Sequence, residues 1–407
     1  MEPNGGFLRQ ILMTDTQPQP QETNRPHDCA GVVPTTHVLS SPATLLASLP
    51  GALGFFPNEA VVLMHLRPLD ADGAAEDCAS APTQYKVSNY QCADIGSASN
   101  IHDMLRDVPV HSRAFTFAVV VSRVPESMMV SVALDLLSSA YDDDGPLVDA
   151  CWFVSEIADG TPYAMMFGPC PDHFDSVVDL GWGGAAECGT VSSVAASPSM
   201  RPLLENGLLP ELDQSFVFEH FDPVSLADVA RCDHLAARAH ERGGELLDLT
   251  FVAPYLARPD IERACDLFIT APTVSLIDSE GSLLLDDIFS SDEDLELFAA
   301  LLSRNRLRDC LIVDALANPN GAGAVLLSVA RNFTGEIRAN ALSLWAMIAV
   351  SRNLPAWAGV ALQRAEEEVP GHNLAGLLVK IMQIGRIKEL LQAMSRGCRE
   401  TWLELEE

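Results

Sequence analysis

Short apolar runs separated by polar segments fill the first half of the chain and predict a β-sheet. Runs of strand length cover Ala60–Leu66, Phe115–Val121, Ala150–Ile157 and Tyr163–Phe167. Between the second and third runs, Pro125 opens a stretch whose apolar residues have helical spacing. A strand, a helix and a strand with short connections predict two parallel strands. Asp159-Gly160 then predicts a hairpin, so the sheet is expected to be mixed.

Three further expectations complete this half. A short helix over Thr44–Leu49 is expected to end at Pro50-Gly51, because proline and glycine interrupt helices. Residues 70–99 are acidic, small and rich in turn formers, which predicts a flexible loop. Residues 190–195 predict one more strand.

Beyond about Phe221 the apolar spacing becomes helical. An alanine-rich helix is expected between Ser225 as N-cap and Gly243 as C-terminal stop. Ser291 and the acidic residues after it predict the start of another helix. The helices expected are Pro259–Phe268, Leu295–Leu302, Arg308–Ala317, Ala322–Asn332, Glu336–Ser351, Pro355–Glu368, His372–Ile384 and Ile387–Met394.

These patterns predict a mixed-sheet α/β domain followed by an α-helical hairpin domain. The division is a disordered leader over residues 1–36, rich in Pro and Gln, then the α/β domain over 37–220 and the helical domain over 221–407. The hairpin within Leu342–Pro370 is tetratricopeptide-like, with Ala346 and Ala358 where two helices cross closely.

Trp345 and Trp357 lie within this hairpin and have two interpretations. Large aromatic side chains usually fill the space between helices. A helical array also exposes a concave face, where two tryptophans would bind a peptide of a protein partner. The two residues are therefore both core candidates and partner-binding candidates.

Charge excludes several classes of partner. The chain has 56 Asp and Glu against 25 Lys and Arg, a formal net charge of -31, and residues 1–200 hold only seven Lys or Arg. We therefore expect binding neither to nucleic acid nor to an anionic membrane. No apolar run reaches the roughly 20 residues of a membrane-spanning helix, which predicts a cytoplasmic protein. Ten cysteines without a CxxC pair are expected to be reduced core thiols.

The two ends of the patterned region resemble an actinobacterial family known as a domain of unknown function. The N-terminal part of the resemblance is a helix with Leu45, Leu46 and Pro50, then Leu53-Gly54-Phe55 and Pro57 leading into the strand at Val61-Val62. The C-terminal part is the alanine-rich hairpin Ala349–Ala365, then Pro370, His372 and the apolar helix Leu374–Leu378.

The resemblance spans about residues 37–395 and implies the fold and a cytoplasmic setting, but no activity. Members often carry closely spaced cysteines in the central segment, whereas this chain has the separated Cys170 and Cys188. The Leu-Gly-Phe-x-Pro turn also has a physical reason, because Gly54 permits positive φ and Pro57 blocks helix continuation.

Three kinds of candidate chemical site occur in the sequence. Cys170 and His173 have the spacing of half a zinc site, with Cys188, Cys232 and His234 downstream, but this pattern is weak and no metal is expected. Acid and imidazole groups are neighbours at Asp172-His173 with Asp175, and at Glu219-His220 with Asp222; a solvated surface is the simpler interpretation of both.

Asn318–Gly323 imitates a phosphate loop but lacks the Lys and the following Ser or Thr, so a turn between helices is expected. The chain contains no G-x-S-x-G, HExxH or GxGxxG motif, and no cofactor is expected. Two functional hypotheses follow. The first is a non-enzymatic interaction or regulatory module that binds a protein partner through the helical domain. The second is an enzyme of unassigned reaction with a pocket between the two domains.

Overall fold

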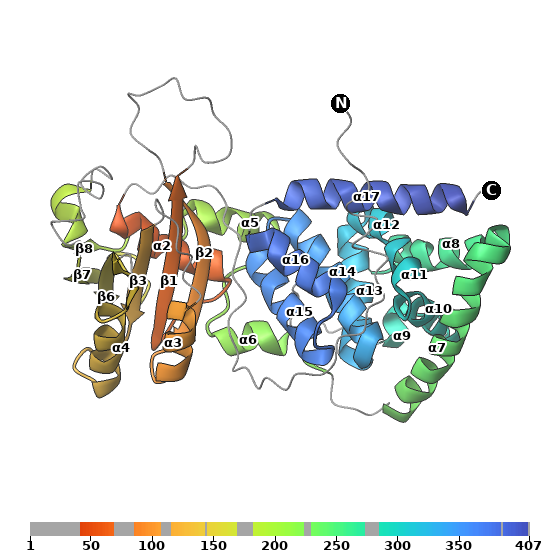
Figure 1. The fold of residues 1–407 in the computed structure, drawn as a ribbon, viewed down its shortest axis with the longest axis horizontal. Coiled ribbons are helices and arrows are strands. Elements are labelled where there is room, and N and C mark those ends of the chain that lie inside the picture. The colour runs from red at the N-terminus through yellow and green to blue at the C-terminus, as the bar shows by residue number, and fades with distance from the viewer. Residues whose placement is uncertain are drawn as a thin grey trace, which may run out of the picture.

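The structure is a computed structural model and describes residues 41–68, 85–106, 115–142, 145–168, 182–223, 229–272, 285–383 and 386–405. A β-sheet with its covering helices occupies one end of the molecule, and a group of α-helices occupies the other (Figure 1). The predicted leader at 1–36 lies outside the described residues. The predicted fold class, α/β followed by helices, is confirmed.

The sheet is six-stranded, in the order β2-β1-β3-β6-β7-β8. Its strands are β1 (Ala60–Pro68), β2 (Tyr85–Asp94), β3 (Phe115–Val121), β6 (Ala150–Val154), β7 (Pro162–Phe167) and β8 (Cys188–Thr190). β3 and β6 are parallel and the other neighbours are antiparallel, so the predicted mixed sheet is confirmed. A separate short ladder joins β4 (Tyr141–Asp142) to β5 (Gly145–Pro146).

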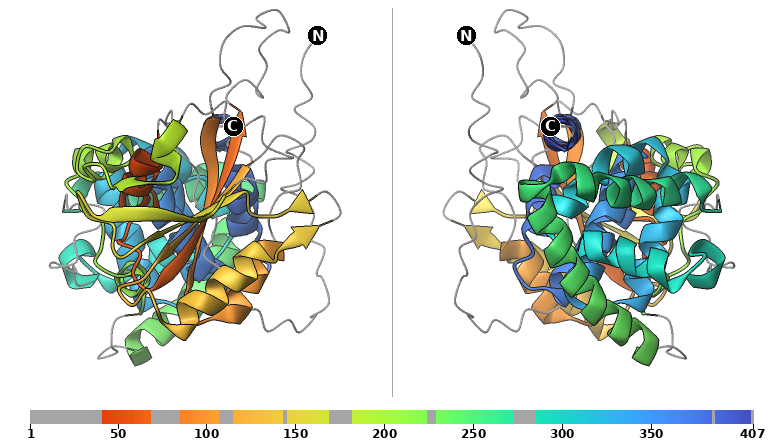
Figure 2. Two further views of the ribbon diagram at one scale, coloured as in Figure 1. Left: turned by 90° about the vertical axis from the view of Figure 1, so that its left-hand side faces the viewer. Right: turned by 90° about the vertical axis from the view of Figure 1, so that its right-hand side faces the viewer.

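Each face of the sheet is buried against different helices. Val61 and Leu63 of β1 pack with α3 (Ala98–Arg106) and α4 (Met128–Ser138) in a core of their own. Val62 and Met64, which alternate with them, face a larger core. That larger core includes α2 (Pro42–Leu53) and continues without a break into the helical half. Figure 2 shows α3 and α4 together on the outer side of the sheet.

The prediction of a flexible loop over residues 70–99 is wrong for its described part. Residues 85–94 form strand β2, and α3 starts at Ala98. A register shift opposite His65 and Leu66 of β1 places Val87 and Tyr90 on the same buried face. Strict alternation is lost there, which is why the apolar pattern did not indicate a strand. Residues 69–84 lie outside the described part.

Two other boundaries differ from the sequence expectation. α2 continues through Pro50 and ends at Gly54, whose φ of 79° is left-handed. Its first turn is closed by a capping box between Ser41 and Thr44. The last strand is β8, which overlaps the expected 190–195 only at Thr190.

The connection and the helical half are built from consecutive helices. They are α5 (Arg201–Glu205), α6 (Gln214–Glu219), α7 (Val229–Val252), α8 (Pro254–Thr270), α9 (Leu285–Ile288), α10 (Asp292–Leu302), α11 (Asn305–Asp309), α12 (Ile312–Ala317), α13 (Pro319–Asn332), α14 (Gly335–Ser351), α15 (Pro355–Glu368), α16 (Asn373–Gln383) and α17 (Ile387–Glu404). Ser291 caps α10 as expected, accepting a hydrogen bond from the Asp294 amide. Ser225 lies outside the described residues.

Two glycines lie inside helices although Gly243 was expected to end a helix and Gly321 was expected in a turn between helices. A Cβ on Gly243, in the middle of α7, would lie 2.3 Å from Ser303 Oγ and 2.7 Å from the Ala300 carbonyl oxygen. The expected turn at 318–323 is instead the first turn of α13. A Cβ on Gly321 in this turn would lie 2.1 Å from the Phe268 carbonyl oxygen. Both glycines permit a close helix crossing, which sequence alone does not distinguish from a stop.

The hairpin predicted within Leu342–Pro370 is formed by α14 and α15. Ala346 and Ala358 are fully buried. The connection is short, with Asn353 at a positive φ of 57°. The likeness to a tetratricopeptide unit and the domain boundary at 220 stay predictions. Within the described residues, no helix has both the length and the apolar composition needed to cross a membrane.

Candidate functional site

Trp345 of α14 and Trp357 of α15 are buried, at 0% and 1% exposure, where the helical half meets the α/β half. They contact two residues that follow α6. The Phe221 ring lies 4.7 Å from the Trp345 ring and the His220 ring lies 5.3 Å from the Trp357 ring, both edge to face. The aromatic groove of the hairpin is therefore filled by this chain's own segment.

The N-terminal turn reaches the same place. A Cβ on Gly54 would lie 3.2 Å from Trp357 Nε1, so the turn backbone packs against that indole. The Gly54 carbonyl oxygen accepts from the Glu211 amide at 2.8 Å, and the Glu211 carbonyl oxygen accepts from the Phe56 amide at 2.8 Å. The two ends of the family resemblance, far apart in sequence, thus meet in space.

Arginines of the helical half hold the segment after α6 in place. Arg338 Nη2 donates to the Phe221 carbonyl oxygen at 3.0 Å, and Arg331 Nε donates to that of Asp222 at 3.2 Å. Arg364 Nη2 is 2.6 Å from Asp222 Oδ1. Burial lowers the pKa of Arg338, and the nearby Glu368 carboxylate, 3.3 Å from Arg338 Nε, opposes that effect. The solvated surface expected at Glu219-His220 with Asp222 is therefore wrong for His220, which is buried, whereas Glu219 is exposed and Asp222 pairs with Arg364.

The structure describes only some of the residues in the sequence pattern that resembles a zinc site. Cys170, Asp172, His173 and Asp175 lie outside the described residues. Cys188 is exposed and Cys232 is buried on α7. In the part of the chain that the structure describes, no three His, Cys, Asp or Glu side chains gather as a metal site requires. The expectation of no metal stays a prediction.

Two buried histidines lie in polar networks that the sequence analysis did not identify. His65 of β1 lies between β2 and β3, with Nδ1 3.1 Å from Thr116 Oγ1 and Nε2 3.1 Å from Gln91 Oε1. Burial lowers the pKa of His65. Nearby, Asp149 Oδ2 accepts from the Thr116 amide at 2.7 Å, and burial raises the pKa of Asp149 to about 6.

His372 lies at the start of α16. Its Nδ1 accepts from the Ala375 amide at 3.3 Å, which places the ring proton on Nε2, 3.0 Å from Asn340 Oδ1. Asn340 Oδ1 also accepts from Arg308 Nη1 at 2.6 Å. Burial, with the Arg308 charge, lowers the pKa of His372 to about 4. The sequence showed Pro370 and His372 as a family feature without indicating this role.

Both histidine networks have the properties of structural networks. Each ring nitrogen of His65 and His372 already has a protein partner, and both side chains are buried. A general base needs a free lone pair within reach of a substrate proton. The networks therefore satisfy buried polar groups and hold neighbouring elements together.

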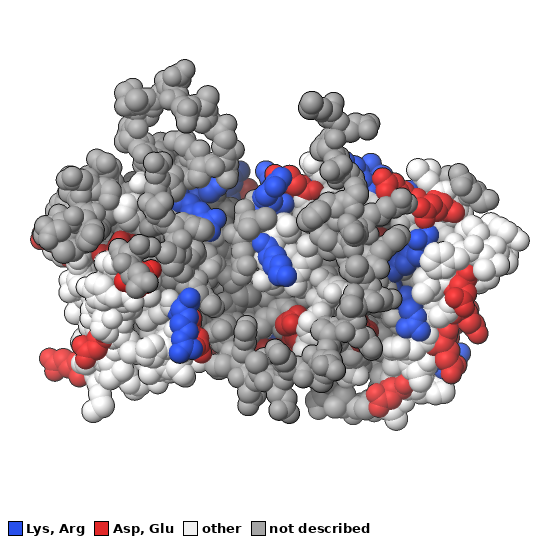
Figure 3. Space-filling model, in the orientation of Figure 1, with Lys and Arg blue, Asp and Glu red and all other residues white. Residues whose placement is uncertain are grey.

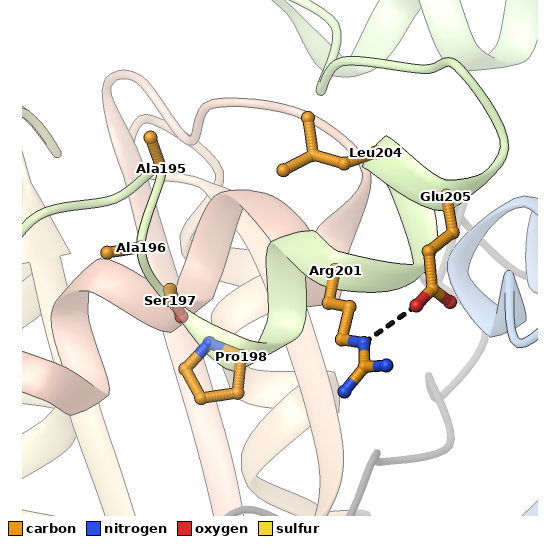
Figure 4. Close-up of a pocket in the computed structure, with 7 residues that line it drawn as sticks. All are labelled: Ala195, Ala196, Ser197, Pro198, Arg201, Leu204 and Glu205. Carbon is orange, nitrogen blue, oxygen red and sulfur yellow. Dashed lines mark hydrogen bonds and ion pairs between the residues drawn. The ribbon is translucent and has the colours of Figure 1, made fainter.

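A surface pocket lies beside α5 (Figure 4). It is lined by Ala195, Ala196, Ser197, Pro198, Arg201, Leu204 and Glu205. Arg201 Nε is 2.7 Å from Glu205 Oε1, and both side chains are largely exposed. The pocket therefore combines a small apolar lining with a charge pair that is already satisfied.

Exposed apolar side chains gather at the turn between α7 and α8. Phe251, Val252, Tyr255 and Leu256 are 66%, 83%, 65% and 54% exposed. Leu403 near the end of α17 is 61% exposed. We call these five residues the apolar tip. Figure 3 shows an uncharged surface at this end of the molecule, with acidic side chains beside it.

Arg306 of α11 joins the two parts of the apolar tip. Its guanidinium lies 4.8 Å from the centre of the Phe251 ring, and its Nη2 lies 2.7 Å from Glu404 Oε2, beside Leu403. The turn and the end of α17 are thus held together by one arginine. Monomeric proteins rarely leave several large apolar side chains exposed together, so the apolar tip is a candidate interaction surface.

Comparison with known proteins gives a family but no function. Neither a curated protein nor a solved structure matches the chain. The profile of one family matches residues 42–386, from the start of α2 to the residue before α17. The match includes the sheet, the junction at Trp345 and Trp357, and both histidine networks. The chain therefore belongs to the family described as domain of unknown function DUF4192.

Proposed function

We propose that the protein is a non-enzymatic interaction module that binds a protein partner through the apolar tip of its helical half. The observation that carries the proposal is the exposure of Phe251, Val252, Tyr255, Leu256 and Leu403 at one end of the molecule. Burying large apolar side chains drives most protein association, and aromatic residues contribute the largest share.

The charge of the chain indicates the chemistry of that partner. Asp248, exposed one turn before Phe251, and Glu404 flank the apolar tip. The whole chain carries a formal charge of -31, so two copies repel each other. A partner segment with apolar residues among Lys or Arg fits this surface better than a second copy does.

This proposal replaces Trp345 and Trp357 as the contact residues with the apolar tip, because both tryptophans are covered by His220 and Phe221. It is favoured over an enzyme with a pocket between the two halves. The described part of that junction is filled by aromatic rings and arginine ion pairs.

The test is selection of peptides from a display library of random sequences on the intact protein. The tip variant carries Val252→Asp and Leu256→Asp. The control carries Met128→Asp and Val132→Asp, which add the same charge to exposed apolar positions of α4 at the opposite end. The wild type and the control should enrich the same apolar and basic peptides, and the tip variant should enrich none. Equal enrichment by the tip variant, or none by the wild type, would contradict the proposal.

A further inference from the structure

Basic residues gather near the C-terminal end of this acidic chain. The whole chain has 56 Asp and Glu against 25 Lys and Arg, but residues 380–399 have five Lys or Arg and a single acidic residue, Glu389. The basic residues are Lys380 on α16, Arg386, and Lys388, Arg396 and Arg399 on α17. All five are exposed. The local charge therefore has the opposite sign to the charge of the whole chain.

Three of these residues lie on one face of α17, which crosses the helical half along one side of the molecule (Figure 1). Because each residue turns a helix by about 100°, Lys388, Arg396 and Arg399 fall within an arc of about 80°. The buried residues Leu390 and Cys398 lie outside this arc. We call the three exposed cations the basic stripe. It is about 17 Å long, since an α-helix rises by 1.5 Å per residue.

The cations of the basic stripe have no carboxylate partner within the described part of the chain. No ion pair and no side-chain hydrogen bond is formed there by Lys388, Arg396 or Arg399. Most of the other described arginines pair with Asp or Glu, as Arg231 does with Asp286 and Arg263 does with Asp294. The donors of the basic stripe are therefore available to an external anion, and a guanidinium binds a carboxylate through two parallel hydrogen bonds.

The size of the basic stripe and the charge around it indicate what kind of anion fits. A nucleic acid or an anionic membrane would extend beyond the stripe, over Glu389 and Glu400 on the neighbouring positions of α17 and over the acidic remainder of the chain. An extended protein segment of about five residues has the same length as the stripe and places its charges over the stripe alone. At physiological salt, charges act over only about 8 Å, so the rest of the chain repels such a short segment little.

We propose that the basic stripe binds an extended, acidic segment of a partner protein. Carboxylates of that segment accept hydrogen bonds from the Arg396 and Arg399 guanidinium groups and from the Lys388 ammonium group. This inference does not rest on the proposed function. The apolar tip requires a partner with apolar and basic residues, whereas the basic stripe requires carboxylates, so the two surfaces are tested with different probes.

The experiment measures binding of fluorescein-labelled hexaglutamate to the full chain by fluorescence anisotropy at low salt. The stripe variant carries Lys388→Gln, Arg396→Gln and Arg399→Gln. The control carries Arg106→Gln, Arg123→Gln and Arg201→Gln, which remove the same charge from exposed side chains that already pair with carboxylates. The wild type and the control should bind equally, and the stripe variant should bind at least about tenfold more weakly, because three charge contacts are lost together.

Binding of hexaglutamate by the wild type should weaken as salt is added, and hexaglutamine, the neutral peptide of the same length, should not bind. Undetectable binding of hexaglutamate by the wild type, or equal binding by the stripe variant and the control, would overturn the inference. So would tighter binding of the wild type to a single-stranded oligonucleotide or to phosphatidylserine vesicles than to hexaglutamate, if the stripe variant lost it. The ligand of the basic stripe would then be a phosphate polymer or a membrane.

Discussion

His372 shows how one side chain at the start of a helix makes stability depend on pH. Its folded pKa is about 4, whereas the unfolded chain has the ordinary value of 6.5. Between these values the unfolded chain binds a proton that the folded chain does not bind. Stability therefore rises with pH through this window and falls as the pH drops from 6.5 towards 4, by up to about 3 kcal/mol.

The variant His372→Gln should be less stable than the wild type at pH 7, by about 1–2 kcal/mol, because it loses hydrogen bonds in a buried network. The difference should disappear or change sign as the pH falls to about 4.5, because the cost of protonating a buried imidazole destabilises only the wild type. Urea unfolding of both proteins at the two pH values measures it. If the difference in the free energy of unfolding were the same at both pH values, the pKa of His372 would not be lowered by folding.

At the scale of elements, two adjacent glycines of α7, Gly243 and Gly244, differ in the space around them. A Cβ on Gly243 would meet the Ala300 backbone in α10 and the side chain of Ser303, its C-cap, whereas a Cβ on Gly244 would meet only Arg304 Nη2, at 3.6 Å. Alanine at either position improves helix propensity, but only at Gly243 does it crowd the crossing of α7 and α10. The two positions therefore allow the two effects to be measured separately.

Gly243→Ala should destabilise the protein by about 1–3 kcal/mol, because α7 and α10 must move apart. Gly244→Ala should stabilise it by about 0.5–1 kcal/mol, because alanine is the better helix former and the space is open. Thermal or urea midpoints of the two variants compare them directly. If both variants were stabilised, the close crossing of α7 and α10 would be wrong.

The regularity of the apolar pattern within each element explains which elements the sequence predicts correctly. β3 coincides with the expected Phe115–Val121 and α15 with Pro355–Glu368, because their apolar periods are uninterrupted. β2 was missed because its register shift removes the alternation. The 24-residue helix α7 was expected to stop at Gly243, because local signals cannot show that another helix requires a glycine there.

At the scale of the whole molecule, the junction between the two halves depends on the N-terminal turn. Gly54 and Gly371 both have φ of 79°, so a side chain at either position strains the backbone. Only Gly54 has a neighbour that an added Cβ would press, Trp357 Nε1 at 3.2 Å, whereas Gly371 has none within 4 Å.

Gly54→Ala should therefore cost more stability than Gly371→Ala, by roughly 1 kcal/mol or more, because the first adds crowding at the junction to the shared backbone strain. Urea unfolding of the two variants, with tryptophan fluorescence as the probe, tests this. Equal losses would mean that the turn does not pack tightly on the hairpin.

The sequence by itself determined the strands with regular patterns, the order of a mixed sheet followed by helices, the hairpin of α14 and α15, the acidic charge and the resemblance at both ends of the domain. Each depends on local spacing, composition or short motifs. Tertiary structure alone decided that Phe221 covers Trp345, that burial lowers the pKa of His372, and that exposed apolar residues meet at the apolar tip. An apolar pattern shows that a face is buried, but the surface that buries it is chosen by contacts between residues far apart in the chain.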